Sequence, residues 1–100
     1  MTDYSKMSDY EISCEVGRAI SFADYLLARN EQKKYCNSWA DAGPIISSNR
    51  IMLNPYCADE LWKAEIPVAD DGFMKTYAVN YNANPLRAAM IVFLMMNEGE

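Results

Sequence analysis

The most informative stretch of the sequence is Asn84-Pro85-Leu86-Arg87-Ala88-Ala89-Met90-Ile91-Val92-Phe93-Leu94-Met95-Met96. Asparagine is favoured at the N-cap of a helix, and proline at the first helical position loses no hydrogen bond that the helix needs. A helix is therefore predicted from Pro85 to about Met96, with Gly99 placed to stop it. No polar side chain occurs from Ala88 to Met96, so this helix is apolar on every face. Such a helix is usually buried on more than one side, and we expect a sheet on one side and a helix or a second copy of the chain on the other.

A second helix is predicted to begin after Ser8. The sequence Ser8-Asp9-Tyr10-Glu11 fits the capping box, in which the serine hydroxyl and the Glu11 carboxylate each accept a hydrogen bond from the other residue's backbone amide. The apolar residues that share one face of this helix, and are predicted to be buried, are Ile12, Val16, Ala19 and Ile20.

The segment from Ser21 to Lys34 fits either a continuation of that helix or a second helix, followed by a loop. Ser21 with Asp24 can cap a separate helix, and Phe22, Tyr25 and Leu26 are spaced as on one helix face.

A short middle helix is predicted after Asn37 or Ser38, because both residues are good N-caps. Gly43-Pro44 is expected to weaken or kink it. Trp39 and Ala42 lie three residues apart and are expected to face inward.

Beyond Arg50 the apolar period changes to two, which is typical of strands. Ile51 and Leu53 begin a first strand, which a turn at Asn54-Pro55 is expected to end. In the second strand, residues 61–66, the predicted buried face consists of Trp62, Ala64 and Ile66. Pro67 is expected to end this strand or to place it at a sheet edge.

Asp70-Asp71-Gly72 predicts a hairpin turn, and a third strand follows from about Phe73 to Asn80. The predicted fold class is α+β: a small antiparallel three-stranded meander with an N-terminal helix, a short middle helix and the apolar C-terminal helix packed on it. At 100 residues, the chain is expected to form a single domain, residues 1–100.

The charge pattern argues against nucleic acid and membrane as partners. The net charge is −5, and only Lys33 and Lys34 are adjacent among the nine basic residues, whereas nucleic-acid binding needs a basic stripe. The longest apolar run, Ala88 to Met96, is far shorter than the roughly 20 residues of a membrane span. The first residues lack the pattern of a signal peptide, so we expect a cytoplasmic protein with reduced thiols.

The cysteines give no sign of a metal site or a disulfide framework. Their number is odd, they are widely spaced and no C-x-x-C occurs. Cys14 is expected to pack inertly in a helix, Cys36 and Cys57 to lie in loops, and Cys57 to be the most exposed thiol.

Acid–base chemistry is poorly supported, because the sequence contains no histidine. A carboxylate site would require convergence in one pocket among Asp41, Asp59, Glu60, Asp70 and Asp71. The adjacent pairs fall in predicted turns, where a structural or solvating role is the usual one. We therefore predict no catalytic residue, no metal site and no cofactor.

Aromatic residues are plentiful and suit either interface anchors or half-buried packing. The seven tyrosines are Tyr4, Tyr10, Tyr25, Tyr35, Tyr56, Tyr77 and Tyr81.

Two segments, Ser8 to Ile12 and Asn84 to Met96, resemble the NinX family of lambda-like phages and prophages, and the segments Tyr35 to Asn37 and Ala40 to Ile46 match it more loosely. The resemblance implies a phage-encoded protein of unknown function that acts inside the host cell, expressed beside recombination and lysis-control genes. It implies no catalytic residues.

Three functions follow as hypotheses. The favoured one is a non-enzymatic protein–protein interaction module in the host cytoplasm, which binds a host or phage protein or a second copy of itself. The alternatives are a small accessory enzyme that uses carboxylates and a nucleic-acid-associated factor of phage replication or recombination.

Overall fold

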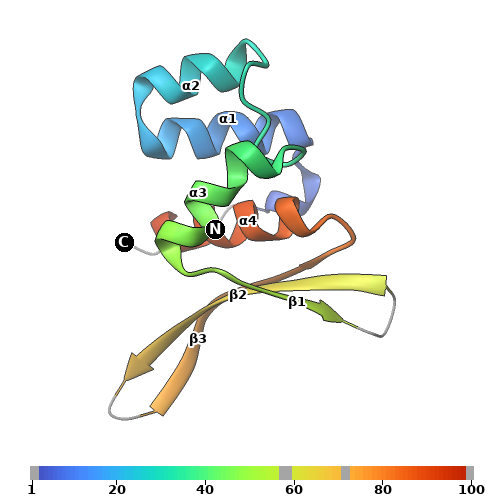
Figure 1. The fold of residues 1–100 in the computed structure, drawn as a ribbon, viewed down its shortest axis with the longest axis vertical. Helices are drawn as coiled ribbons and strands as arrows, with labels where there is room; N and C mark the ends of the chain where they lie inside the picture. Colours follow the sequence, from blue (N-terminus) through green and yellow to red (C-terminus); the bar gives the residue numbers. More distant parts are fainter. Residues whose placement is uncertain (1–2, 57–59, 71–72, 99–100) are drawn as a thin grey trace.

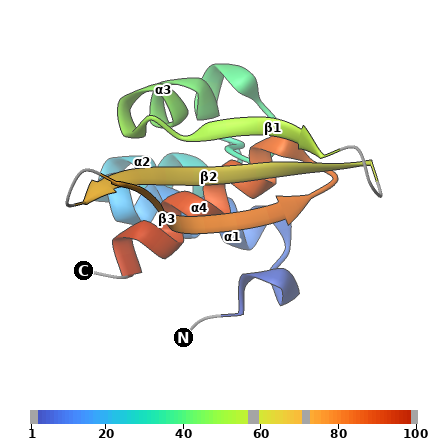
Figure 2. The ribbon, with the colours of Figure 1, turned by 90° about the horizontal axis from the view of Figure 1, so that it is seen from below.

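The computed structural model describes residues 3–56, 60–70 and 73–98, and their side chains over 3–56, 60–67 and 78–97. In chain order the elements are η1 (Tyr4–Lys6), α1 (Asp9–Ile20), α2 (Phe22–Arg29), α3 (Trp39–Asn49), β1 (Met52–Tyr56), β2 (Leu61–Asp70), β3 (Phe73–Asn82) and α4 (Pro85–Glu98). The helices lie together on one face of the sheet (Figures 1 and 2), and α4 lies between the sheet and the α1–α2 pair.

The sheet confirms the predicted α+β meander, with antiparallel strands in the order β1-β2-β3. The two proline predictions have different outcomes. Pro55 does not turn the chain but lies inside β1, opposite Trp62, where an edge strand tolerates its missing donor. Pro67 does not end β2, since pairing with β3 continues to Asp70 across a register shift between Ile66 and Pro67. The alternative of an edge position fits instead, because β1 pairs with β2 only as far as Glu65 and Pro67 has β3 alone as its neighbour.

The hairpin between β2 and β3 is confirmed by the direct pairing of Asp70 with Phe73. The Asp71-Gly72 turn itself lies outside the described residues, as does Gly99 after α4. On the face of the sheet that meets the helices, Ala64, Ile66 and Ala78 are buried, which agrees with the face predicted for the second strand; Trp62 is only half-buried.

The capping box of α1 is confirmed. The Ser8 hydroxyl accepts from the Glu11 amide at 3.1 Å, and Glu11 Oε1 accepts from the Ser8 amide at 3.0 Å. These bonds lower the pKa of the Glu11 carboxyl. The predicted stripe is only half right, because Ile12 and Val16 are buried whereas Ala19 and Ile20 are exposed.

The buried stripe shifts because α2 folds back across α1. Ser21 ends α1 and caps α2, and its hydroxyl accepts a hydrogen bond from the Asp24 amide at 3.1 Å. Of the two alternatives for this segment, a separate second helix is therefore the correct one. Gly17 and Ser13 are consequently buried in place of Ala19 and Ile20. A Cβ on Gly17 would lie 2.7 Å from the Asp24 carbonyl oxygen, so only glycine permits this approach of the two helices.

The outer face of α2 remains exposed. Phe22 is 73% exposed and Leu26 also faces solvent, whereas Ala28 is buried. The helix therefore contributes little to the core apart from its packing on α1.

In α3, the Ser38 cap is confirmed, since its hydroxyl accepts from the Asp41 amide at 3.4 Å. Ala42 faces inward as predicted, but Trp39 does not and is 58% exposed. The helix continues through Pro44. Gly43 explains this continuity, because the steric restriction that proline imposes on the preceding residue acts partly through a Cβ, which glycine lacks.

The central position predicted for α4 is confirmed. Its Asn84 cap accepts from the amides of Leu86 and Arg87, at 2.9 and 3.3 Å. Met90 and Phe93 are buried, at 0% and 7% exposure, because the sheet covers one side of the helix and α1 and α3 cover the other. Its apolar surface is therefore core and not an exposed interface.

No helix within the described residues is long and apolar enough to cross a membrane.

We expect Gly17→Ala to lower the free energy of unfolding by about 1–3 kcal/mol, because the methyl group would push α2 away from α1. Gly43→Ala is the matched control. Its Cβ would meet nothing within 4 Å, so its gain in helix propensity and its cost before Pro44 should leave stability within about 1 kcal/mol of wild type. Urea denaturation of the two variants tests this, and equal losses would contradict it.

Candidate functional site

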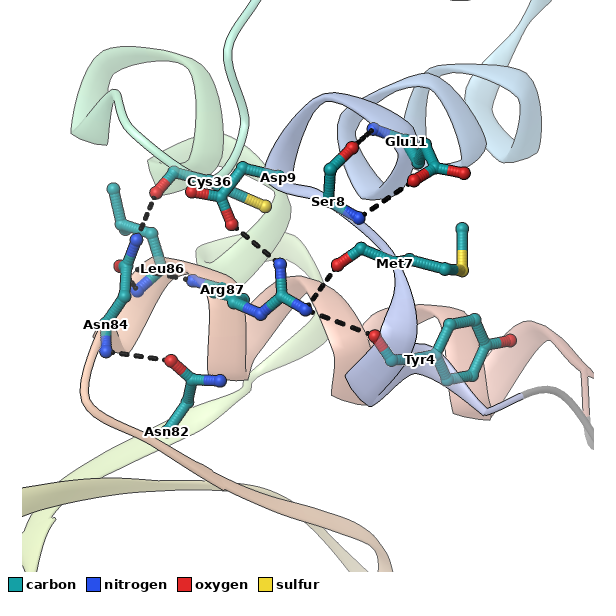
Figure 3. A network of polar contacts seen from close by, with 10 residues as sticks. All are labelled: Tyr4, Met7, Ser8, Asp9, Glu11, Cys36, Asn82, Asn84, Leu86 and Arg87. Carbon is teal, nitrogen blue, oxygen red and sulfur yellow. Dashed lines mark hydrogen bonds and ion pairs between the residues drawn. The ribbon is translucent and has the colours of Figure 1, made fainter.

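The densest polar network of the described residues surrounds Arg87, near the start of α4 (Figure 3). Its Nη1 donates to Asp9 Oδ1 at 2.7 Å, and its Nη2 donates to the carbonyls of Met7 and Tyr4 at 2.6 and 3.2 Å. Arg87 thus ties the segment before α1 to α4. Each bond joins groups of the protein's own backbone or side chains, so we assign this network to the fold and not to ligand binding.

Asn84 extends the same network to the loop before α3. Its Nδ2 donates to the Cys36 carbonyl at 2.7 Å, and its backbone amide donates to Asn82 Oδ1 at 2.9 Å (Figure 3). The Cys36 thiol is fully buried, and burial raises its pKa to about 12. The thiol therefore stays protonated at neutral pH and is unsuited to nucleophilic chemistry.

A cleft opens where α3 diverges from the α1–α2 pair, and we call it the helical cleft. Its volume is about 370 Å³. From α3 it is lined by Ala40, Asp41, Pro44, Ile45, Ser48 and Asn49. Ile20 and Asp24 line it from the α1–α2 corner, and Phe93 of α4 lines it from the helix beneath. Lys33 and Tyr35, from the loop between α2 and α3, complete the lining.

One group of lining residues is polar. Lys33 Nζ lies 3.6 Å from Asp24 Oδ1 and 5.9 Å from the centre of the Tyr35 ring. Asp41 Oδ2 accepts from the Lys34 amide at 2.9 Å, which fixes the loop to the first turn of α3. The two carboxylates are therefore held by the backbone and by neighbouring side chains.

The Tyr35 hydroxyl is the unusual group of the cleft. Tyr35 is 1% exposed, and its hydroxyl has no partner at ordinary hydrogen-bond distance within the described residues, although the Asp24 carboxylate lies near enough for a long, weak contact. Burial raises the pKa of this hydroxyl to about 12, and the nearby carboxylates of Asp24 and Asp41 add to the shift. A buried polar group without a partner is costly, so this hydroxyl calls for an explanation.

The remaining lining is mostly apolar. Ile20 is 44% exposed, an unusual position for a large aliphatic side chain, and Pro44 is also exposed. Ile45 and Phe93 are buried beneath them. Apolar walls beside a few fixed polar groups are the usual composition of a ligand-binding site.

The structure does not bring the five predicted carboxylates into one described site. Asp41 lies in α3 at the helical cleft, whereas Glu60 directly precedes β2. Asp59 and Asp71 lie outside the described residues, as does the side chain of Asp70. Within the described part of the chain, no group of three or more His, Cys, Asp or Glu residues could hold a metal ion.

The cysteine predictions have mixed outcomes. Cys14 is half-buried and packs against the core. Cys36 lies in a loop, as predicted, but is fully buried there. Cys57 lies outside the described residues.

A second surface is the face of the sheet that no described helix covers (Figure 2). Tyr56 and Tyr81 pack edge to face across it, with ring centres 5.2 Å apart, and both are exposed. Between these strands, Lys63 Nζ forms an ion pair with Glu65 Oε2 at 3.1 Å. Its charge is thereby neutralised, so the side chains described on this face do not form the basic groove that single-stranded nucleic acid requires.

Asp24, Lys33 and Tyr35 were not predicted as site residues. Their sequence signals were a helix cap, a lysine pair and one tyrosine among seven, and none of these patterns indicates that the chain folds them into one cleft.

We expect Tyr35→Phe to raise the free energy of unfolding by about 1 kcal/mol, because it removes a buried hydroxyl that lacks a partner. Tyr10→Phe is the contrast, since the Tyr10 hydroxyl donates to the Arg29 carbonyl at 2.8 Å and its loss should lower stability. Thermal denaturation measures the stability change of both variants. A Tyr35→Phe variant less stable than wild type would refute the conclusion that the buried hydroxyl lacks a partner.

We expect Arg87→Met to cost about 2–4 kcal/mol of stability, because it removes the guanidinium that donates to the Asp9 carboxylate and to the Met7 and Tyr4 carbonyls, of which the Tyr4 carbonyl still accepts from the Met7 amide. The control is Arg18→Met, which removes an exposed ion pair with Glu15 and a cation–π contact with the Tyr25 ring, and should cost less than half as much. Urea denaturation of both variants makes the comparison. Similar losses would show that the network contributes little.

The family resemblance was tested against known proteins. A family model described as "Bacteriophage P22, NinX" matches residues 3–97. No curated protein and no solved structure matches the chain. Because the family match covers nearly every residue, the chain belongs to the NinX family of bacteriophage proteins.

Proposed function

We propose that this phage protein is a non-enzymatic interaction module that binds a segment of another protein in the helical cleft, inside the host cytoplasm. The observation that carries the proposal is the composition of the cleft, in which apolar walls adjoin a buried hydroxyl that has no partner among the described residues. A bound segment would supply that partner and would cover Ile20 and Pro44.

The size of the cleft agrees with this role. A volume of about 370 Å³ is at the lower end of the roughly 300–1,000 Å³ typical of ligand sites. We expect it to hold one or two side chains of a partner while the rest of the partner lies across the surface. Exposed aromatic residues such as Trp39 and Phe22, on the adjoining helices, are of the kind that anchors protein interfaces.

Catalysis in the cleft is less well supported. The chain has no histidine, and Asp24 and Asp41 already accept hydrogen bonds that hold helix ends and loops. The Tyr35 hydroxyl, with its pKa raised to about 12, stays protonated at neutral pH and is a poor general base. These groups suit recognition better than proton transfer.

Binding of nucleic acid in the cleft is also disfavoured. Two carboxylates face the space against one lysine ammonium, so a phosphate would meet net negative charge.

The proposal is tested by filling the cleft. Ser48 lines it and its neighbour Ser47 does not, although both are exposed residues of α3. We expect Ser48→Trp to lose a partner protein that wild type and Ser47→Trp both retain in affinity capture from phage-infected cells. The partner is then purified, and its affinity for each variant is measured by calorimetry.

Light scattering on the purified variants tests the alternative that the partner is a second copy of the chain. If Ser48→Trp and Ser47→Trp bind the purified partner equally, the cleft is not the binding site and the proposal fails.

A further inference from the structure

We infer that the helical cleft recognises a positively charged side chain, arginine or lysine, that adjoins an apolar residue in the bound segment. This inference rests on the proposed function and adds the chemistry of the partner. Three observations carry it: the balance of charge in the cleft, the unpartnered hydroxyl and the apolar walls.

The first observation is a surplus of negative charge. Asp24 is paired with Lys33 at 3.6 Å, so these two charges largely cancel. Within the described residues Asp41 has no such cation, because its Oδ2 accepts from the neutral Lys34 amide. The other oxygen, Oδ1, has no partner among the described residues and can accept from a ligand. Asp41 is only half-buried, so a cation can reach it from solvent.

The second observation is the Tyr35 hydroxyl. Its oxygen can accept a hydrogen bond from a guanidinium or ammonium group, both of which carry only donors. The hydroxyl is closed to solvent in this structure, so such a ligand would reach it after a local shift of the lining and would then satisfy the hydroxyl and the Asp41 carboxylate together. A carboxylate or phosphate ligand would instead meet the uncompensated charge of Asp41.

A backbone group adds to the acceptors. Pro44 has no amide hydrogen, so the Ala40 carbonyl lacks the donor that a helix normally supplies four residues later. Both residues line the cleft.

The third observation is the apolar surface beside these acceptors. Ile20, Pro44 and Phe93 line the same cleft. The methylene stem of arginine or lysine, or the adjoining apolar residue, would cover this surface while the charged head reaches Asp41. The net charge of −5 on the whole chain would also favour encounters with a basic segment.

The helix dipole limits how strongly the cleft should prefer a cation. Asp41 lies in the first turn of α3, where the positive end of the helix dipole offsets part of its charge. We therefore expect a preference for the cation of about tenfold in affinity, which corresponds to a single good charged contact.

The test uses three acetylated and amidated tripeptides, Leu-Arg-Leu, Leu-citrulline-Leu and Leu-Glu-Leu. Citrulline has the shape of arginine without its charge. Each peptide is titrated into the ¹⁵N-labelled full chain, and the backbone amides of Lys34, Ala40 and Ser48 report binding in the cleft. We expect the arginine peptide to bind about tenfold more tightly than the citrulline peptide, and the glutamate peptide to bind most weakly.

Variants identify the groups responsible. Asp41→Asn can still accept from the Lys34 amide, so it should fold, and we expect it to remove the preference for arginine over citrulline. Tyr35→Phe should fold at least as well as wild type but bind the arginine peptide several-fold more weakly. Glu15→Gln, a carboxylate on α1 that does not line the cleft, should leave the preference unchanged.

The outcomes separate this inference from the proposed function. Equal binding of the arginine and citrulline peptides in the cleft would overturn the inference but support the cleft as a docking site. Tightest binding of the glutamate peptide would overturn it in favour of Lys33 as the anchor. Binding by none of the peptides would also overturn it, and the comparison of Ser48→Trp with Ser47→Trp would then decide the proposed function alone.

Discussion

The fold depends on one constraint, the need to cover α4 on all sides. Residues Ala88 to Met96 carry no polar side chain, so exposure of any face of this helix would leave apolar surface in water. The sheet covers one side, and α1 and α3 cover the other. These two helices pack on α4 and diverge from each other, and Phe93 lines the space between them. The packing that completes the core therefore also creates the helical cleft.

The polar groups near this core differ in whether they have hydrogen-bond partners. Arg87, the charged residue in the first turn of α4, has donors bound to Asp9 and to two carbonyls, so its burial contributes to the fold. The Tyr35 hydroxyl is more deeply buried than Arg87 but has no partner at ordinary hydrogen-bond distance among the described residues. Asn80 Oδ1, on β3, is the other such buried atom in the described part of the chain. Of these two atoms, only the Tyr35 hydroxyl belongs to a residue that lines the cleft beside two carboxylates.

The parts of the fold that sequence predicts well are those fixed by neighbours in the chain. The caps at Ser8, Ser21, Ser38 and Asn84 depend on residues two or three positions away, and all four occur. Burial depends instead on partners distant in sequence. Ala19 and Ile20 are exposed because α2 crosses α1 at Gly17, nearer the middle of the helix. Pro67 stays within β2 because a register shift accommodates it. The spacing of apolar residues along the sequence indicates neither the helix crossing nor the register shift.

The candidate site was not predictable for the same reason, since its polar groups come from α2, the following loop and α3. The residues that line the cleft nevertheless come largely from two short segments in the middle of the chain. The middle segments, residues 35–37 and 40–46, supply Tyr35, Asp41, Pro44 and Ile45 to the cleft. The segments at Ser8 and at Asn84 supply caps and core. The features that make the chain recognisable thus specify mainly its fold, and a role in binding is better sought in the middle segment, where a proline within a helix and an unpartnered hydroxyl are difficult to explain by stability alone.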